Sequence, residues 1–144
     1  MPHRRHILRA FAAMSAAASL PGSAATIPPG EHVRSFSSMG GYGTWNYAVD
    51  YPDTLAVIAL VCGAGDSDCA ERIRHLPVWA FHGALDDAVP IAGDREMVVA
   101  LKAAGGNVKF TVYPHVGHNA WDPAYADPAL YAWLLAQRRR SSSR

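Results

Sequence analysis

The sequence is poor in charge and in long apolar stretches, and each shortage excludes a class of protein. Charged residues make up 17% of the 144 residues, and the formal net charge is +1. Because much of the positive charge lies at the two ends of the chain, no basic face is left for nucleic acid. The weakly hydrophobic stretch over residues 10–18 is too short and too polar to span a bilayer. With 50% hydrophobic residues, the sequence is typical of an ordinary globular protein of one domain.

Cysteine is also scarce. Only Cys62 and Cys69 occur, and no cluster of other ligands accompanies them at the fixed spacing typical of a metal site. The flexible residues 63–68 between them could allow a disulfide in an exported protein. Two free thiols are the alternative, and the sequence leaves the choice open.

The first 25 residues predict a signal peptide of the twin-arginine type. Arg4 and Arg5 precede an apolar pair and a further arginine, and a run of small residues follows. Small residues over 23–25 allow cleavage after Ala25. We expect residues 26–35 to be a linker and the mature protein to be periplasmic or secreted, with no membrane attachment. A flexible basic N-terminus without a role in export is the alternative.

Helices and strands alternate in the remaining sequence. Apolar spacing predicts helices over 40–51 and 93–104 and a last helix that begins at Pro128. Apolar or alternating runs predict strands over 55–61, 77–82 and 108–113. This order favours a parallel sheet with crossover helices, in which reactive groups gather at the carboxyl ends of the strands. We expect this domain to span 36–138 and residues 139–144 to form a disordered tail.

Three motifs lie at such strand ends. Ser38 begins the glycine-rich segment 38–43, where a sharp turn before a helix can expose a hydroxyl group. A capping serine at an ordinary helix start is the alternative. Asp86 follows the second predicted strand and can orient an imidazole, and His118 follows the third strand and supplies one. The order Ser, Asp, His is the order expected for a nucleophile, its orienting acid and its base in this kind of fold.

Residues 38–137 resemble the C-terminal half of the α/β-hydrolase superfamily. The sequence is most similar to carboxylesterases, phospholipase/carboxylesterases and dienelactone-hydrolase-like enzymes, which overlap with prolyl-oligopeptidase-type peptidases. The matching segments are Ser38 to Trp45, Tyr51-Pro52-Asp53, Pro77 to Gly83 with Asp86 and Val89-Pro90, and Gly117-His118. The resemblance implies a serine hydrolase that cleaves small-molecule carboxylic esters through an acyl-enzyme, without metal or organic cofactor. It assigns Ser38 as nucleophile, His118 as general base, Asp86 as acid and the Met39 N–H as an oxyanion donor.

The sequence departs from this family pattern in two ways. Phe36 stands where the nucleophile motif usually has glycine, which predicts a crowded turn. The strands that precede the nucleophile in the family are missing, so we expect the chain to lack a second oxyanion donor, at a cost of about 10²–10³ in kcat. A prolyl-oligopeptidase-type peptidase and a non-catalytic remnant are therefore alternatives, and the remnant could be stable as a homo-oligomer through its exposed sheet edge.

Four neighbouring residues compete for these roles. We expect Asp87 to be solvated and His115 to be a surface residue. His82 has a structural role in this interpretation. Trp121 either lines a substrate pocket or packs in the core, and packing is the preferred interpretation.

Overall fold

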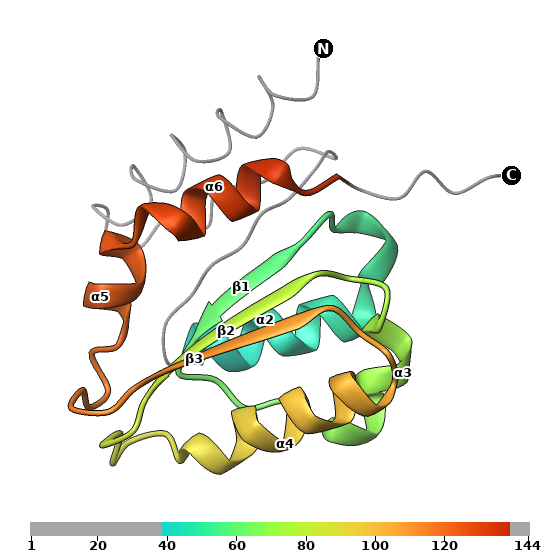
Figure 1. Cartoon of the computed structure of the whole chain (residues 1–144). Helices are drawn as coiled ribbons and strands as arrows, with labels where there is room; N and C mark the ends of the chain where they lie inside the picture. Colours follow the sequence, from blue (N-terminus) through green and yellow to red (C-terminus); the bar gives the residue numbers. More distant parts are fainter. Residues whose placement is uncertain (1–38, 139–144) are drawn as a thin grey trace, which may run out of the picture.

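Three parallel strands form the centre of the computed structural model, which describes residues 39–138 (Figure 1). They are β1 (Ile58–Val61), β2 (Val78–Gly83) and β3 (Val108–Tyr113), and within the described residues they form one sheet in the order β1-β2-β3. The predicted signal peptide, the linker, Phe36, Ser38 and the tail after residue 138 lie outside the described residues.

Helices cover both faces of this sheet (Figure 1). The first face carries α2 (Met39–Asp50), α3 (Ala70–Ile73) and α4 (Ile91–Ala103). The opposite face carries α5 (Trp121–Ala126) and α6 (Pro128–Ala136). Two short 3-10 helices, η1 (Pro52–Thr54) and η2 (Ser67–Cys69), flank β1. The predicted α/β class with a parallel sheet and crossover helices is therefore confirmed.

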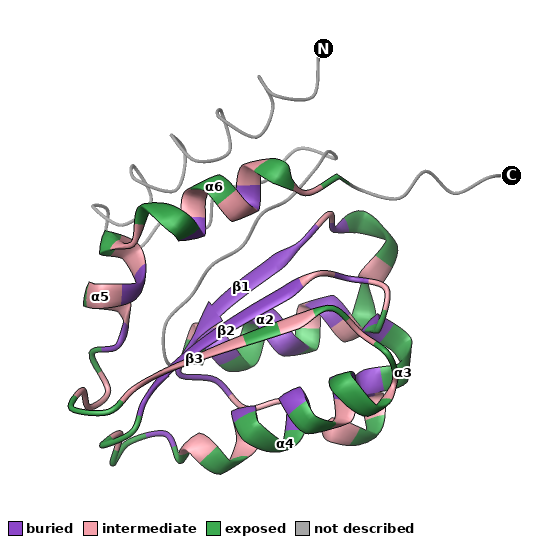
Figure 2. Ribbon diagram, in the orientation of Figure 1, coloured by how far each residue is buried: buried purple, intermediate pink, exposed green. Residues whose placement is uncertain are grey.

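The alternation of side chains along each strand divides the core into two clusters. Ile58 and Leu60 of β1 face α2, α3 and α4 and pack there with Trp45, Ile73 and Leu101. Ala59 and Val61 point to the other face, where Phe81 of β2 and Leu130 of α6 complete a second cluster. Figure 2 shows β1 and β2 buried along their length, while β3 is mostly intermediate.

Local sequence signals account for most element ends. Asp127 caps α6, because its side chain accepts a hydrogen bond from the N–H of Ala129. After α4, Gly105 adopts a φ of +77°, the left-handed conformation that favours glycine, and the N–H of Gly106 returns to the carbonyl of Leu101. The prediction that β1 begins at residue 55 was wrong, since a 3-10 turn at Pro52 delays strand pairing until Ile58 meets Val78.

No helix among residues 39–138 has the length and apolar character needed to cross a membrane.

Candidate active site

Asp86 is fixed in the loop that follows β2. Its Oδ1 atom accepts hydrogen bonds from the N–H groups of Ala88 and Val89, at 3.0 and 2.8 Å. These bonds close a tight turn around the carboxylate, whose side chain is fully buried. The Oδ2 atom faces the loop that follows β3. The loop after β2 therefore presents one carboxylate oxygen to it in a defined direction.

His118 lies in that neighbouring loop, after β3, and meets this oxygen. The distance from His118 Nδ1 to Asp86 Oδ2 is 2.9 Å. The imidazole is 25% exposed, and the indole of Trp121 packs edge-on against it with ring centroids 5.5 Å apart. Within the described residues, no hydrogen-bond partner occupies the other ring nitrogen, Nε2. The arrangement orients an imidazole so that Nε2 is available to a reacting group.

Gly83 allows the two loops to approach each other. A Cβ atom at this position would overlap the carbonyl oxygens of Val116 and Gly117 in the His118 loop. The N–H of Ala84 bonds to the Tyr113 carbonyl, which ties the end of β2 to the end of β3. The absence of a side chain at Gly83 is thus a condition for the contact between Asp86 and His118.

The surroundings of Asp86 favour its ionised form. Burial by itself raises the pKa of this carboxyl group, but hydrogen bonds from the Val89 N–H, from His118, from Cys62 and from the Ala88 N–H outweigh it. The pKa of Asp86 is therefore lowered. A carboxylate at this position stabilises a positive charge on the adjacent imidazole, as a general base requires.

Cys62, the residue after β1, borders the site. Its φ of 52° lies in the left-handed region, and its Sγ atom contacts the carbonyl of His118 at 3.4 Å. Burial and the nearby Asp86 raise the pKa of the thiol to about 12, so the group is a neutral donor. Cys69 contacts Asp66 instead, and both cysteines are free thiols in the structure.

The start of α2 lies at the same edge of the sheet. A Cβ atom on Gly41 would come within 2.7 Å of the Cα atom of Gly63, directly beyond β1. Since Cys62 contacts the His118 loop, the first turn of α2, the end of β1 and the His118 loop are neighbours. Met39, the first residue of α2, has a side chain that is 84% exposed, and Ser38 precedes it in sequence.

Both the sequence and the fold are similar to those of known hydrolases. Over 112 residues, 68% of this chain, the sequence is 34% identical to a protein of Methylorubrum extorquens named "Putative carboxymethylenebutenolidase". The structure matches that of a thermostable esterase with a TM-score of 0.71 and 31% identity, over 88% of this chain. The chain belongs to the α/β-hydrolase superfamily.

A third match is a Klebsiella pneumoniae protein named "Putative Dienelactone Hydrolase", with a TM-score of 0.52 and 27% identity over 63% of this chain and 41% of that chain. No protein-family model matches the sequence. The chain spans 38% of the Methylorubrum protein and 36% of the esterase. The similarity therefore concerns part of each relative.

The structure separates the residues that compete for the site by their burial and by their contact with His118. Asp87 and His115 are exposed, while the carboxylate that meets His118 belongs to Asp86. Trp121 is half-buried and lies against the imidazole, so it contacts the site as well as the second core cluster. His82 is fully buried beside Asp86, with its Nε2 atom 3.4 Å from Oδ2. This proximity could not be predicted from the sequence, because a histidine at a strand end is common in buried cores.

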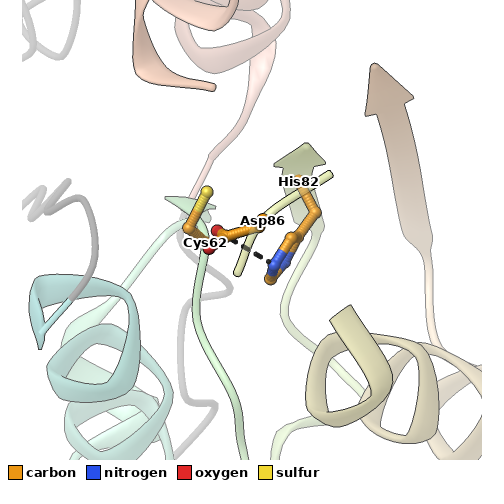
Figure 3. A group of neighbouring side chains, drawn as sticks. All are labelled: Cys62, His82 and Asp86. Carbon is orange, nitrogen blue, oxygen red and sulfur yellow. Dashed lines mark ion pairs between the residues drawn. The ribbon is translucent and has the colours of Figure 1, made fainter. Parts of the chain in front are cut away.

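One group of side chains has the donor types of a metal site. Figure 3 shows Cys62, His82 and Asp86 turned toward one another, and their ligand atoms lie within 4.8 Å. The chemistry of the donors does not suit a metal, however. The Nε2 atom of His82 faces the carbonyl oxygen of Val89 at 2.9 Å and therefore carries a proton instead of a free lone pair. The raised pKa of the Cys62 thiol also disfavours the thiolate that metals bind.

Proposed function

We propose that this chain is a serine hydrolase that cleaves carboxylic esters through an acyl-enzyme, with Ser38 as nucleophile, His118 as general base and Asp86 as orienting acid. The observation that supports it most is the contact between His118 Nδ1 and the buried Asp86 Oδ2 at 2.9 Å. A named esterase among the similar structures supports the class of substrate.

The contact between His118 and Asp86 supports the proton transfers that we propose for this reaction. The Nδ1–H group of His118 donates a hydrogen bond to Asp86 and keeps its proton, which leaves Nε2 as the acceptor for a proton from the serine hydroxyl. The serine oxygen then attacks the ester carbonyl, and the imidazolium, stabilised by Asp86, returns the proton to the leaving alcohol. Water releases the acyl group by the same steps in reverse.

The first turn of α2 is the proposed source of electrophilic assistance. The N–H groups at the start of a helix have no partner within the helix, and the helix dipole favours negative charge there. We assign the N–H of Met39 as one donor to the oxyanion of the tetrahedral intermediate. The proposed steps use groups of the chain and water, and the proposed location of the mature enzyme is outside the cytoplasm.

Labelling with a fluorophosphonate probe tests the proposal on the full chain. We expect labelling that is lost in Ser38→Ala and in His118→Gln and kept in His115→Gln, an exposed histidine of the same loop. Hydrolysis of a short-chain aryl ester should follow the same pattern. Absence of labelling in a soluble, cooperatively melting chain would refute the proposal, and amide cleavage as fast as ester cleavage would replace the esterase by a peptidase.

A further inference from the structure

A buried histidine and a buried aspartate form a pair beneath the candidate site. His82 is the next-to-last residue of β2 and Asp94 lies in the first turn of α4, and both side chains are 0% exposed. The distance from His82 Nδ1 to Asp94 Oδ2 is 2.7 Å. Neither residue belongs to the proposed catalytic groups, yet two titratable groups are buried here at the expense of their hydration.

The hydrogen-bond partners determine the charge of each group. Asp94 accepts the indole N–H of Trp45 at 2.8 Å on Oδ1 and the N–H of Gly63 at 3.2 Å on Oδ2. With both oxygens accepting, Asp94 is a carboxylate. The two ring nitrogens of His82 face only acceptors, Asp94 Oδ2 and the carbonyl of Val89, so both nitrogens are donors. The ring is thus an imidazolium.

His82 also reaches Asp86 by two routes. Its Nε2 atom lies 3.4 Å from Asp86 Oδ2, the same oxygen that meets His118. In addition, Nε2 donates to the Val89 carbonyl, and the Val89 N–H donates to Asp86 Oδ1. A movement of His82 would therefore displace the turn that aims the Asp86 carboxylate.

We propose that His82 is a positioning residue: a buried imidazolium, shared between Asp94 and Asp86, that holds the Asp86 turn in register with α4 and α2. The link to α2 is Trp45, whose indole N–H reaches Asp94 from inside the first core cluster. This proposal rests on the proposed function for its catalytic meaning, but the buried ion pair stands without it.

The groups around His82 favour its charge. Burial lowers its pKa, but the hydrogen bonds to Asp94 and Val89 and the charges of Asp94 and Asp86 outweigh burial, so the pKa of His82 is raised. The thiol of Cys62, at the end of β1, faces the same space and is neutral. His118 contacts the same Asp86 oxygen, with its Nδ1 atom 2.9 Å from Oδ2.

The charge of the ring is tested on the unmodified full chain by NMR of ¹⁵N-labelled histidine. We expect both ring nitrogens of His82, recognised by their contact with Val89, to be protonated at pH 7. When His82 loses a proton at higher pH, the ¹³Cγ signal of Asp86 should move with the same midpoint. A neutral ring at pH 7, or an Asp86 signal that does not follow His82, would overturn the proposal.

The catalytic part is tested with Asp94→Asn, which keeps the shape and removes the charge. In this variant we expect His82 to be neutral at pH 7. We also expect kcat to fall by about tenfold or more while KM stays within about threefold of wild type, because a small misplacement of Asp86 is costly. His75→Asn, a partly exposed histidine away from this pair, is the matched control.

The outcomes separate the two proposals. Unchanged kcat in an Asp94→Asn chain that labels at Ser38 overturns the positioning role and keeps the esterase. An unlabelled wild-type chain with a charged His82 refutes the esterase and keeps the ion pair. If Asp94→Asn does not melt cooperatively, the joint titration of His82 and Asp86 in the unmodified chain decides.

Discussion

Asp86 Oδ2 has two histidine neighbours, His82 at 3.4 Å and His118 at 2.9 Å, and the two differ in burial and in their hydrogen bonds. We call the side of His82 the closed side and the side of His118 the open side. On the closed side, His82 is fully buried and both its ring nitrogens are occupied. On the open side, the His118 side chain is one-quarter exposed, and of its two ring nitrogens only Nδ1 has a hydrogen-bond partner within the described residues. A residue that must exchange protons with a substrate needs a vacant nitrogen and access, whereas a residue that fixes geometry needs neither.

The largest difference between the sides should be seen when each histidine is replaced. His118→Gln should lower kcat for ester hydrolysis by about 10⁴-fold or more, because the base is lost. Its stability cost should be only about 1 kcal/mol, the worth of one hydrogen bond at a partly exposed position. Stopped-flow or steady-state kinetics and thermal melting measure the two quantities. Retained activity in His118→Gln would remove the distinction between the open and the closed side.

Gly83 lies between the Asp86 loop and the His118 loop, and a side chain at this position should disturb the packing of both loops. Gly83→Ala must displace the backbone carbonyls of Val116 and Gly117, so we expect a loss of about 3 kcal/mol or more in the free energy of unfolding. Gly43→Ala is the matched control. It lies exposed in α2 with no atom near the added methyl group, and should stabilise the chain by about 0.5–1 kcal/mol. Equal effects in urea melts would show that the loops do not pack as described.

The free energy of unfolding should depend on pH with opposite signs for the two sides. The lowered pKa of Asp86 means that its contribution is present above its ordinary value of 3.8 and is lost as pH falls through the folded value. The raised pKa of His82 means that its contribution is complete below 6.5 and declines as pH rises through the folded value. Urea melts from pH 3 to pH 8.5 should therefore show greatest stability between about 4 and 6.5. A stability that rises steadily from pH 6.5 to 8.5 would contradict a charged His82.

The sequence predicted the open side far better than the closed side. The order of strands and helices follows from apolar periodicity, and the parallel sheet is confirmed. Once the sheet is parallel, residues that follow neighbouring strands, such as Asp86 and His118, must lie at one edge. Their catalytic roles, and that of Ser38, stay predictions.

The contacts on the closed side could not be predicted, because Asp94 and Trp45 stand in sequence contexts that are common in ordinary helices. Asp94 sits in the first turn of an amphipathic helix, where an acidic residue is ordinary dipole compensation. Trp45 is a core position by periodicity, and nothing in that periodicity says where its N–H points. The hydrogen bonds of Asp94 in α4 to Trp45 in α2 and to His82 in β2 join segments that are far apart in the chain, and apolar periodicity does not predict such contacts. The short helix α5 was also missed, because its six residues carry too little periodicity to be recognised.

The smallest expected effect concerns Trp121, which covers the open side. Its indole lies edge-on to His118, and an aromatic contact of this kind is worth about 0.5–1.5 kcal/mol. Trp121→Ala should therefore lower kcat by about two- to tenfold, because the imidazole gains freedom while Asp86 still holds its Nδ1. Trp121→Phe should recover most of that loss, and Leu85→Ala, an exposed side chain in the neighbouring loop, should have no effect. A fall in kcat of a thousandfold in Trp121→Ala, with His118 still in contact with Asp86 by NMR, would instead place the indole among the groups that bind the substrate.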